Sequence, residues 1–143
     1  MNTVGTIELE SLAVRSENIV HLPLGLLGFE QIKRYALLEN PHEAPFRWLQ
    51  VLDDPSLAFL VLPSAEIPLD YAPDVAKEDV EFLELSSPED ALLFNIVTLR
   101  DQKRATVNLK APIVANRYTL KAKQVVPVNA ARYSLQHPLP IAN

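Results

Sequence analysis

The sequence contains no cysteine, which excludes disulfide bridges, thiolate metal sites and cysteine nucleophiles. A chain without cysteine suits a reducing compartment, and we expect a cytoplasmic protein. It also lacks a long apolar run and a basic segment followed by an apolar one, so we expect neither a membrane helix nor a secretory signal. With 143 residues, 48% of them hydrophobic, the chain can bury a core of its own, and we expect a single domain over residues 1–143.

Glycine is scarce: the chain has three, and two of them lie in "PLGLLGFE" at residues 23–30. A Gly-x-x-Gly pair is compatible with a phosphate-binding loop or with a tight turn that packs on the core. A phosphate loop usually has a cation nearby, but leucine and phenylalanine side chains surround these glycines, and the next basic residue is Lys33. The sequence therefore favours a packed turn in which Gly25 and Gly28 satisfy the backbone conformation, although the same apolar loop would suit a recognition element if it were exposed.

Recognisable catalytic and metal-binding motifs are missing as well. The three histidines, His21, His42 and His137, lie far apart, so a local zinc motif is absent. Neither a Gly-x-Ser-x-Gly elbow nor a Walker-type glycine loop occurs. Asp53-Asp54 precedes a proline and is typical of a turn, whereas a catalytic triad assembled from distant segments stays open at this level. We expect no enzyme activity, no cofactor and no metal.

Apolar residues recur mainly with period two, which is typical of β-strands. Ile7 and Leu9 alternate with glutamates, and so do Val80 and Phe82. Further short segments rich in aliphatic and aromatic residues are 19–22, 35–38, 46–52, 57–62, 92–99, 105–109, 113–115 and 124–128, separated by polar or proline-bearing breaks. This pattern predicts an all-β, mostly antiparallel, small barrel-like or sandwich domain.

Helix signals are few and short. Residues 28–34 and 74–79 each predict one or two helical turns. The segment 87–90, "SPED", resembles a helix start with a serine cap and a proline after it, but we favour a turn there because 92–99 continues as a strand-like run.

Charge is distributed unevenly along the chain. Residues 1–99 carry 17 acidic and 5 basic side chains, whereas residues 100–143 carry 1 acidic and 8 basic ones. Residues 74–90, here called the acidic segment, hold seven carboxylates and only one cation, Lys77. Such a run is either a solvated face or a docking surface for a basic partner.

Six short motifs together resemble the FliW family of flagellar assembly factors. They are "GLLGFE" (25–30), "PFRWLQ" (45–50), "LAFLV" (57–61), "DY" (70–71), "NLKAPIVAN" (108–116) and "YSLQHPL" (133–139). Their order and spacing match the family from end to end, and the overall length is similar.

The resemblance implies a compact, mostly β binding protein without a catalytic reaction. Proteins of this family bind two alternative partners, the flagellin subunit and the translational regulator CsrA. CsrA held in this way cannot repress flagellin messenger RNA, and flagellin that accumulates before export releases CsrA. The resemblance implies that the contact on CsrA lies away from the RNA-binding surface of CsrA, so that inhibition of RNA binding is allosteric. The resemblance implies no direct contact with nucleic acid or with membranes.

The residues suggest where partners dock. CsrA-type regulators bind RNA and carry basic surface, so the acidic segment is the candidate contact for CsrA, through Glu78, Asp79, Glu81 and Glu84. For flagellin we expect an apolar groove or an exposed strand edge.

Amide and aromatic side chains in the motifs have two possible roles. Asn108, Gln124, Gln50 and Asn116 are either hydrogen-bonded to hold loops or presented to a partner, and we name Asn108 and Gln124 as partner-binding candidates. The aromatic residues Phe29, Phe46, Trp48 and Phe59 are expected in the core, and Pro112 belongs to the same structural motifs.

A competing hypothesis comes from the basic part of the chain. Residues 100–132 hold eight cations and Tyr118, a pattern that would suit a small β-barrel binding single-stranded RNA through charge and stacking. The overall acidity, and pairing of these cations with the acidic half, argue against it.

Overall fold

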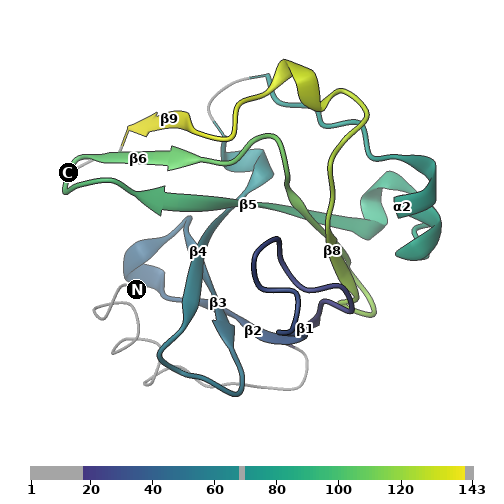
Figure 1. Ribbon diagram of the computed structural model, residues 1–143, viewed down its shortest axis with the longest axis horizontal. Coiled ribbons are helices and arrows are strands. Elements are labelled where there is room, and N and C mark those ends of the chain that lie inside the picture. The colour runs from purple at the N-terminus through teal and green to yellow at the C-terminus, as the bar shows by residue number, and fades with distance from the viewer. Residues whose placement is uncertain (1–17, 68–69, 141–143) are drawn as a thin grey trace.

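The computed structural model describes residues 18–67 and 70–140, in which nine strands form one sheet (Figure 1). All strand pairs are antiparallel, which confirms the predicted all-β class. The strands are β1 (Ile19–His21), β2 (Arg34–Glu39), β3 (Arg47–Val51), β4 (Ala58–Pro63), β5 (Ala91–Leu99), β6 (Arg104–Val107), β7 (Ile113–Asn116), β8 (Ala122–Gln124) and β9 (His137–Pro140).

Strand β5 organises the sheet because it pairs with three others. Its first half pairs with β7, its middle with β4 and its end with β6. From β5 the sheet continues through β7 to β8, and a single bridge between His21 and Lys121 brings β1 back beside β8. The sheet thus curls into a barrel-like shape, while β6 and β9 extend from the other end of β5 (Figure 1).

The core lies mainly inside the curled part of the sheet. Its largest cluster joins β1, β2, β3 and β5 through side chains such as Val20, Tyr35, Leu49 and Phe94. Burial raises the pKa of the Tyr35 hydroxyl to about 12. A second cluster, with Val97, Val107 and Leu139 among its members, fills the space under β6 and β9.

Helical structure is brief, as expected, but its positions differ from the prediction. The α-helix α2 covers Lys77–Phe82, and single 3₁₀ turns cover η2 (Pro41–Glu43), η3 (Ser64–Glu66), η4 (Pro88–Asp90) and η5 (Ala130–Arg132). The strand-like alternation around Val80 and Phe82 was therefore misleading. The helix predicted at 74–79 starts three residues later, and the one predicted at 28–34 is wrong, since residues 28–31 form turns and a strand starts at Arg34.

Three further differences concern strands. The strand predicted at 124–128 ends at Gln124, and β9, which carries two prolines, had not been predicted. The strand expected around Ile7 and Leu9 lies outside the described residues. Within the described ranges no helix is long and apolar enough to cross a membrane.

Candidate partner-binding site

Helix α2 ends in a hydrogen-bonded motif that shapes the acidic segment. The N–H of Leu85 donates to the carbonyl of Val80 at 3.0 Å, and the N–H of Glu84 donates to that of Glu81 at 3.1 Å. These two bonds define a Schellman motif, which reverses the chain and brings the side chains at its two ends together. Glu84 takes the left-handed conformation with φ +57°, a position that glycine or asparagine usually fills.

The Asn116 side chain fastens this helix end to the sheet. Its Nδ2 donates to the carbonyl oxygens of Leu83 at 2.9 Å and Glu84 at 3.2 Å. Its Oδ1 accepts from the backbone N–H groups of Tyr118 and Thr119. One buried amide therefore satisfies carbonyl groups that a helix end leaves without partners, and it closes the turn after β7.

Asp79 points inward rather than outward. Its side chain forms an ion pair with Lys123 of β8, and the residue is only 5% exposed. The ring of Phe82 lies beneath Lys121, whose Nζ is 4.1 Å from the ring centroid, and Lys123 lies nearby at 5.7 Å. Of the four carboxylates predicted to dock a partner, Asp79 is thus engaged inside the protein, in contrast to Glu78, Glu81 and Glu84, which are exposed.

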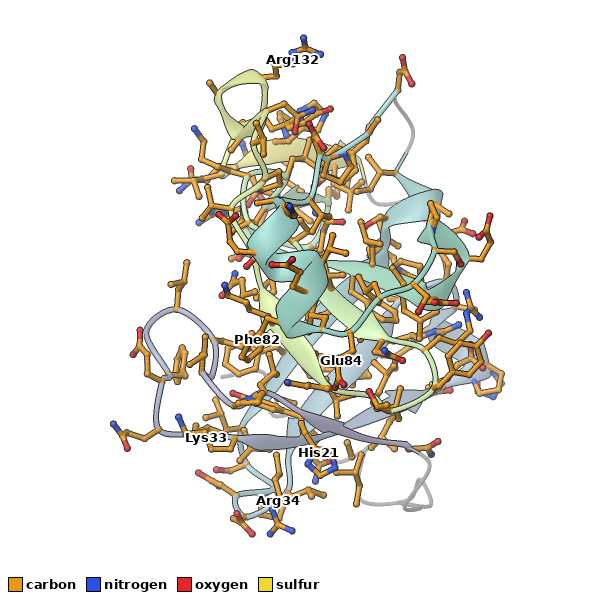
Figure 2. All side chains as sticks on the ribbon, turned by 90° about the vertical axis from the view of Figure 1, so that its right-hand side faces the viewer. His21, Lys33, Arg34, Phe82, Glu84 and Arg132 are labelled. Carbon is orange, nitrogen blue, oxygen red and sulfur yellow. The ribbon has the colours of Figure 1, made fainter. Side chains whose placement is uncertain are left out.

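The outer surface of the acidic segment is strongly negative. Figure 2 looks onto α2 from outside, with Phe82 and Glu84 near its lower end. Within residues 74–90 the one cation is Lys77, which is exposed as well. Such a field attracts a basic partner and raises its association rate. The exposed carboxylates are those of Asp74, Glu78, Glu81, Glu84 and Glu89.

An apolar groove of about 410 Å³ runs beside α2. Val80 and Leu85 form one wall, and Ala91 and Leu93 of β5 form the floor. The remaining lining residues are Pro73, Val75, Ser86, Ser87 and Pro88. The sequence analysis did not identify this groove, because the residues that line it come from three separate segments.

The glycine loop, residues 22–33, forms turns and packs on the core through Leu22 and Leu26, but its tip is exposed, so the predicted packed turn describes only part of it. Gly25 has φ +68°, and a Cβ there would lie 2.6 Å from the Cα of Glu30, so no other residue fits. Gly28 has φ +89° with open space around it. The N–H of Gly28 donates to the Glu30 carboxylate at 3.0 Å, and this bond is the main reason why the pKa of Glu30 lies below its usual value.

The tip of the glycine loop exposes apolar side chains. Leu24 is 52% exposed and Leu27 64%. Phe29 was expected in the core, but it is 38% exposed, although its ring packs edge-on against Phe59 with centroids 5.0 Å apart. Trp48 is buried as expected, and its Nε1 donates to Glu43.

The two amides named as partner-binding candidates meet at Ala111. The Oδ1 of Asn108 accepts from the N–H of Ala111 at 2.9 Å, and the Nε2 of Gln124 donates to the carbonyl of Ala111 at 3.1 Å. The Oε1 of Gln124 also accepts from the N–H of Leu27 at 2.8 Å, which ties the glycine loop to β8. The side chains of Asn108 and Gln124 thus hold loops in place. Pro112, which follows Ala111 in the chain, is fully buried.

A buried polar network around Asn95 was not predicted. The Nδ2 of Asn95 donates to the Tyr71 hydroxyl at 3.0 Å and to the carbonyl of Asn108 at 2.9 Å, and its Oδ1 accepts from the Ser64 hydroxyl. Burial raises the pKa of Tyr71. An asparagine in the middle of the apolar run 91–99 was the available signal. Gln50, also a motif amide, is buried too.

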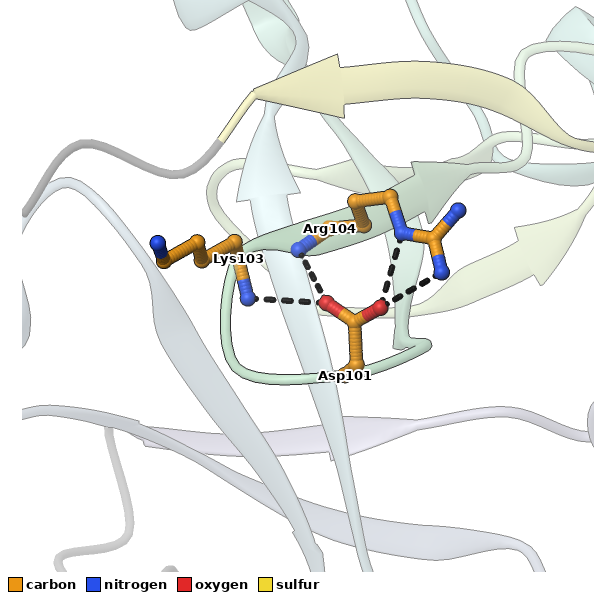
Figure 3. A network of polar contacts seen from close by, with 3 residues as sticks. All are labelled: Asp101, Lys103 and Arg104. Atoms are coloured by element: carbon orange, nitrogen blue, oxygen red, sulfur yellow. Dashed lines mark hydrogen bonds and ion pairs between the residues drawn. The ribbon is translucent and has the colours of Figure 1, made fainter.

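The basic residues do not form one stripe. Arg100, Lys103 and Arg104 line a groove at the tip of the β5–β6 hairpin, whereas Lys121 and Lys123 pack against α2. Arg104 pairs with Asp101 at 2.7 Å, as Figure 3 shows. Hydrogen bonds from the N–H of Lys103 and from Arg104 hold the pKa of Asp101 below its usual value.

No group of three or more metal-ligating side chains converges within residues 18–67 and 70–140. The candidate partner-binding site therefore consists of three surface features: the negatively charged helix α2, the apolar groove beside it, and the apolar tip of the glycine loop. Both α2 and the glycine loop are attached to β8.

Comparison with known proteins assigns the chain to a family. The family model described as "FliW protein" matches residues 3–139. The flagellar assembly factor FliW of Geobacter sulfurreducens is 38% identical over 136 residues, which cover 94% of this chain and 84% of the relative. That of Leptospira biflexa is 36% identical over 126 residues, 87% of this chain and 82% of the relative.

A solved structure agrees with these sequence relatives. The crystal structure of a flagellar assembly factor FliW superimposes with a TM-score of 0.78 at 29% identity, covering 88% of each chain. Sequence and fold thus match over nearly the whole length, which supports a role in flagellar assembly: the chain belongs to the FliW family.

Proposed function

We propose that this protein is a non-catalytic regulator of flagellar assembly that binds CsrA and flagellin alternately in the cytoplasm. CsrA held by the protein would not repress flagellin messenger RNA, and flagellin awaiting export would displace CsrA. The protein would thus act both as a chaperone-like holder of flagellin and as an antagonist of CsrA. Membership of the FliW family supports this proposal.

The observation that carries the CsrA part is the exposed carboxylate surface of α2. Glu78, Glu81 and Glu84 are exposed, Lys77 is the one cation within residues 74–90, and Lys123 is engaged by Asp79, so the three glutamates remain available to a basic partner. Glu84 keeps its charge at a left-handed position where glycine would be less strained, as expected if the carboxylate is needed there. Asp79 leaves the proposed contact set because it is occupied by Lys123.

The test is a calorimetric titration of the protein into cognate CsrA over a series of salt concentrations. Charge reversal of Glu78, Glu81 and Glu84 to lysine should weaken binding and flatten its salt dependence, since exposed charges act mainly through a screened field. Glu66→Lys is the matched control, because Glu66 is an exposed glutamate outside the acidic segment. Unchanged affinity and salt dependence in the triple variant would rule out electrostatic docking at α2.

The partner switch needs two further titrations. Cognate flagellin bound first should abolish CsrA binding, and the protein should displace flagellin leader RNA from CsrA. Simultaneous binding of CsrA and flagellin would contradict the switch while leaving both individual contacts intact.

Binding of single-stranded RNA is the second candidate. It is favoured by the groove that Arg100, Lys103 and Arg104 line at the β5–β6 hairpin. The pairing of Arg104 with Asp101 and of Lys123 with Asp79 lowers the charge available to RNA. A gel shift with nonspecific RNA that weakens steeply with salt would favour this function, and the absence of any shift would remove it.

A further inference from the structure

The groove beside α2 is an apolar hollow within the most acidic part of the chain. Val75, Leu85 and Leu93, which line it, are half-buried and pack against a buried cluster of Leu83, Val114 and Val125. The groove therefore has a firm apolar floor that solvent still reaches. Hollows of this size and apolar character in a surface typically mark contact sites.

Three hydrogen-bonded elements hold the groove open. The Schellman motif brings Val80 and Leu85 together on the α2 side. On the opposite side the carboxylate of Asp90 accepts from the N–H groups of Ser86 at 3.0 Å and Ser87 at 3.1 Å, which fixes the η4 turn.

The third wall, around Val75, is held through its neighbour Asp74. The N–H of Asp74 donates to Asn129 Oδ1 at 2.8 Å, and its carbonyl accepts from the N–H of Val128 at 2.8 Å. Because all three walls have internal partners, a ligand would enter a preformed site and lose little entropy in ordering it.

The charges on these same walls restrict what can fill the groove. Asp74, Glu78, Glu81, Glu84 and Glu89 are exposed on the segment that forms the walls, and they outnumber the cations there, which are Lys77 on the same segment and Arg117, whose Nε donates to the carbonyl of Glu89. An acidic or neutral partner would gain nothing from this field, whereas a basic segment would be attracted and oriented by it.

We infer that the groove beside α2 anchors one large apolar side chain carried on a basic segment of a partner protein. The apolar anchor supplies affinity at the centre of the contact, and the surrounding carboxylates supply specificity and speed of association. The inference rests on the proposed function where it identifies this partner with CsrA, but the groove's preference for an apolar anchor between cations can be measured without CsrA.

The first experiment uses two synthetic peptides and methyl NMR of the full-length protein. One peptide is lysine-rich with a single central leucine, and in the other a serine replaces the leucine. The leucine peptide should bind about tenfold more tightly and shift the methyl signals of Val75, Val80, Leu85 and Leu93. The difference between the peptides should persist at high salt, since apolar burial is not screened. Equal binding of the two peptides, or shifts confined to other methyl groups, would overturn the inference.

The second experiment fills the groove. Ala91→Leu places a larger side chain on its floor, and Thr98→Leu, the control, places the same leucine side chain at the exposed far end of β5. Ala91→Leu should weaken CsrA binding about tenfold without changing its salt dependence, whereas Thr98→Leu should leave it unchanged. Circular dichroism checks folding, and if Ala91→Leu fails to fold, the peptide pair on the wild-type protein decides.

The outcomes separate the two proposals. If CsrA binds the wild type and the folded Ala91→Leu variant equally well, the groove inference fails and the proposed function stands. If CsrA does not bind the wild type but the leucine peptide enters the groove, the proposed function fails and the groove remains a site for another basic partner.

Discussion

The acidic segment and the glycine loop are fastened to neighbouring residues of β8 by different chemistry. Lys123 holds α2 through an ion pair with Asp79, whereas Gln124 holds the glycine loop through a neutral hydrogen bond to the N–H of Leu27. Successive side chains of a strand point to opposite faces, so one strand can serve both. The protein therefore attaches its charged surface by charge and its apolar surface by a neutral amide.

The two regions also differ in what they expose. The acidic segment presents carboxylates around an apolar groove, while the glycine loop presents Leu24 and Leu27 at its tip. Substitutions in the glycine loop should alter mainly backbone geometry. Those in the acidic segment should alter mainly electrostatics.

The largest effect is expected at Gly25. Gly25→Ala should lower the free energy of unfolding by about 3 kcal/mol, because the left-handed backbone is strained for alanine and its Cβ would overlap the backbone of Glu30. Gly28→Ala is the matched control and should lose only about 1 kcal/mol, since no atom lies near its Cβ. Urea denaturation measures both, and equal losses would show that the clash at Gly25 relaxes.

The second largest effect on stability is expected for the ion pair between Asp79 and Lys123. Asp79→Asn should lower the free energy of unfolding by about 2 kcal/mol, because it removes a charged hydrogen bond from a buried position. Glu78→Gln, an isosteric change at the exposed neighbour, should stay within about 0.5 kcal/mol of the wild type. A loss at Asp79 no larger than at Glu78 would mean that the pair contributes nothing to holding α2.

Features set by local chemistry were predictable from the sequence. Alternation and short segment lengths gave the all-β class, and scarce glycines in apolar surroundings gave the packed turn at Gly25 and Gly28. Both depend on residues close together in the chain. The membership of the FliW family followed from motifs spread along the sequence.

Features set by distant partners were not predictable. Asp79 looked like a surface residue because its partner, Lys123, lies 44 positions away. The alternation of Val80 and Phe82 fits a strand, but over so few residues it fits a helix end equally well, and in the structure Phe82 packs against a cluster that includes Val114 of β7. Prolines disfavour a strand in general, which makes β9 hard to see in the sequence, yet among the described strands β9 pairs only with β6, and prolines are tolerated on such an edge.

The attachment of the glycine loop should be weaker than that of α2. Gln124→Ala should lower the free energy of unfolding by about 1 kcal/mol, since it removes one hydrogen bond from the N–H of Leu27 and one to the carbonyl of Ala111. Hydrogen exchange of the Leu27 amide should accelerate in this variant. Gln136→Ala is a control with an exposed glutamine side chain, and unchanged exchange at Leu27 would contradict the proposed attachment.

The smallest effect has the opposite sign and separates function from stability. Glu84→Gly should raise the free energy of unfolding by about 0.5–1 kcal/mol, because glycine fits the left-handed position that ends α2. Glu84→Ala removes the same carboxylate but keeps the strain, so it should bring no gain. If the carboxylate serves a basic partner, both variants should weaken CsrA binding equally despite their different stabilities. Weaker binding in only one of them would assign the effect to backbone conformation, and the strain at Glu84 would then lack a functional reason.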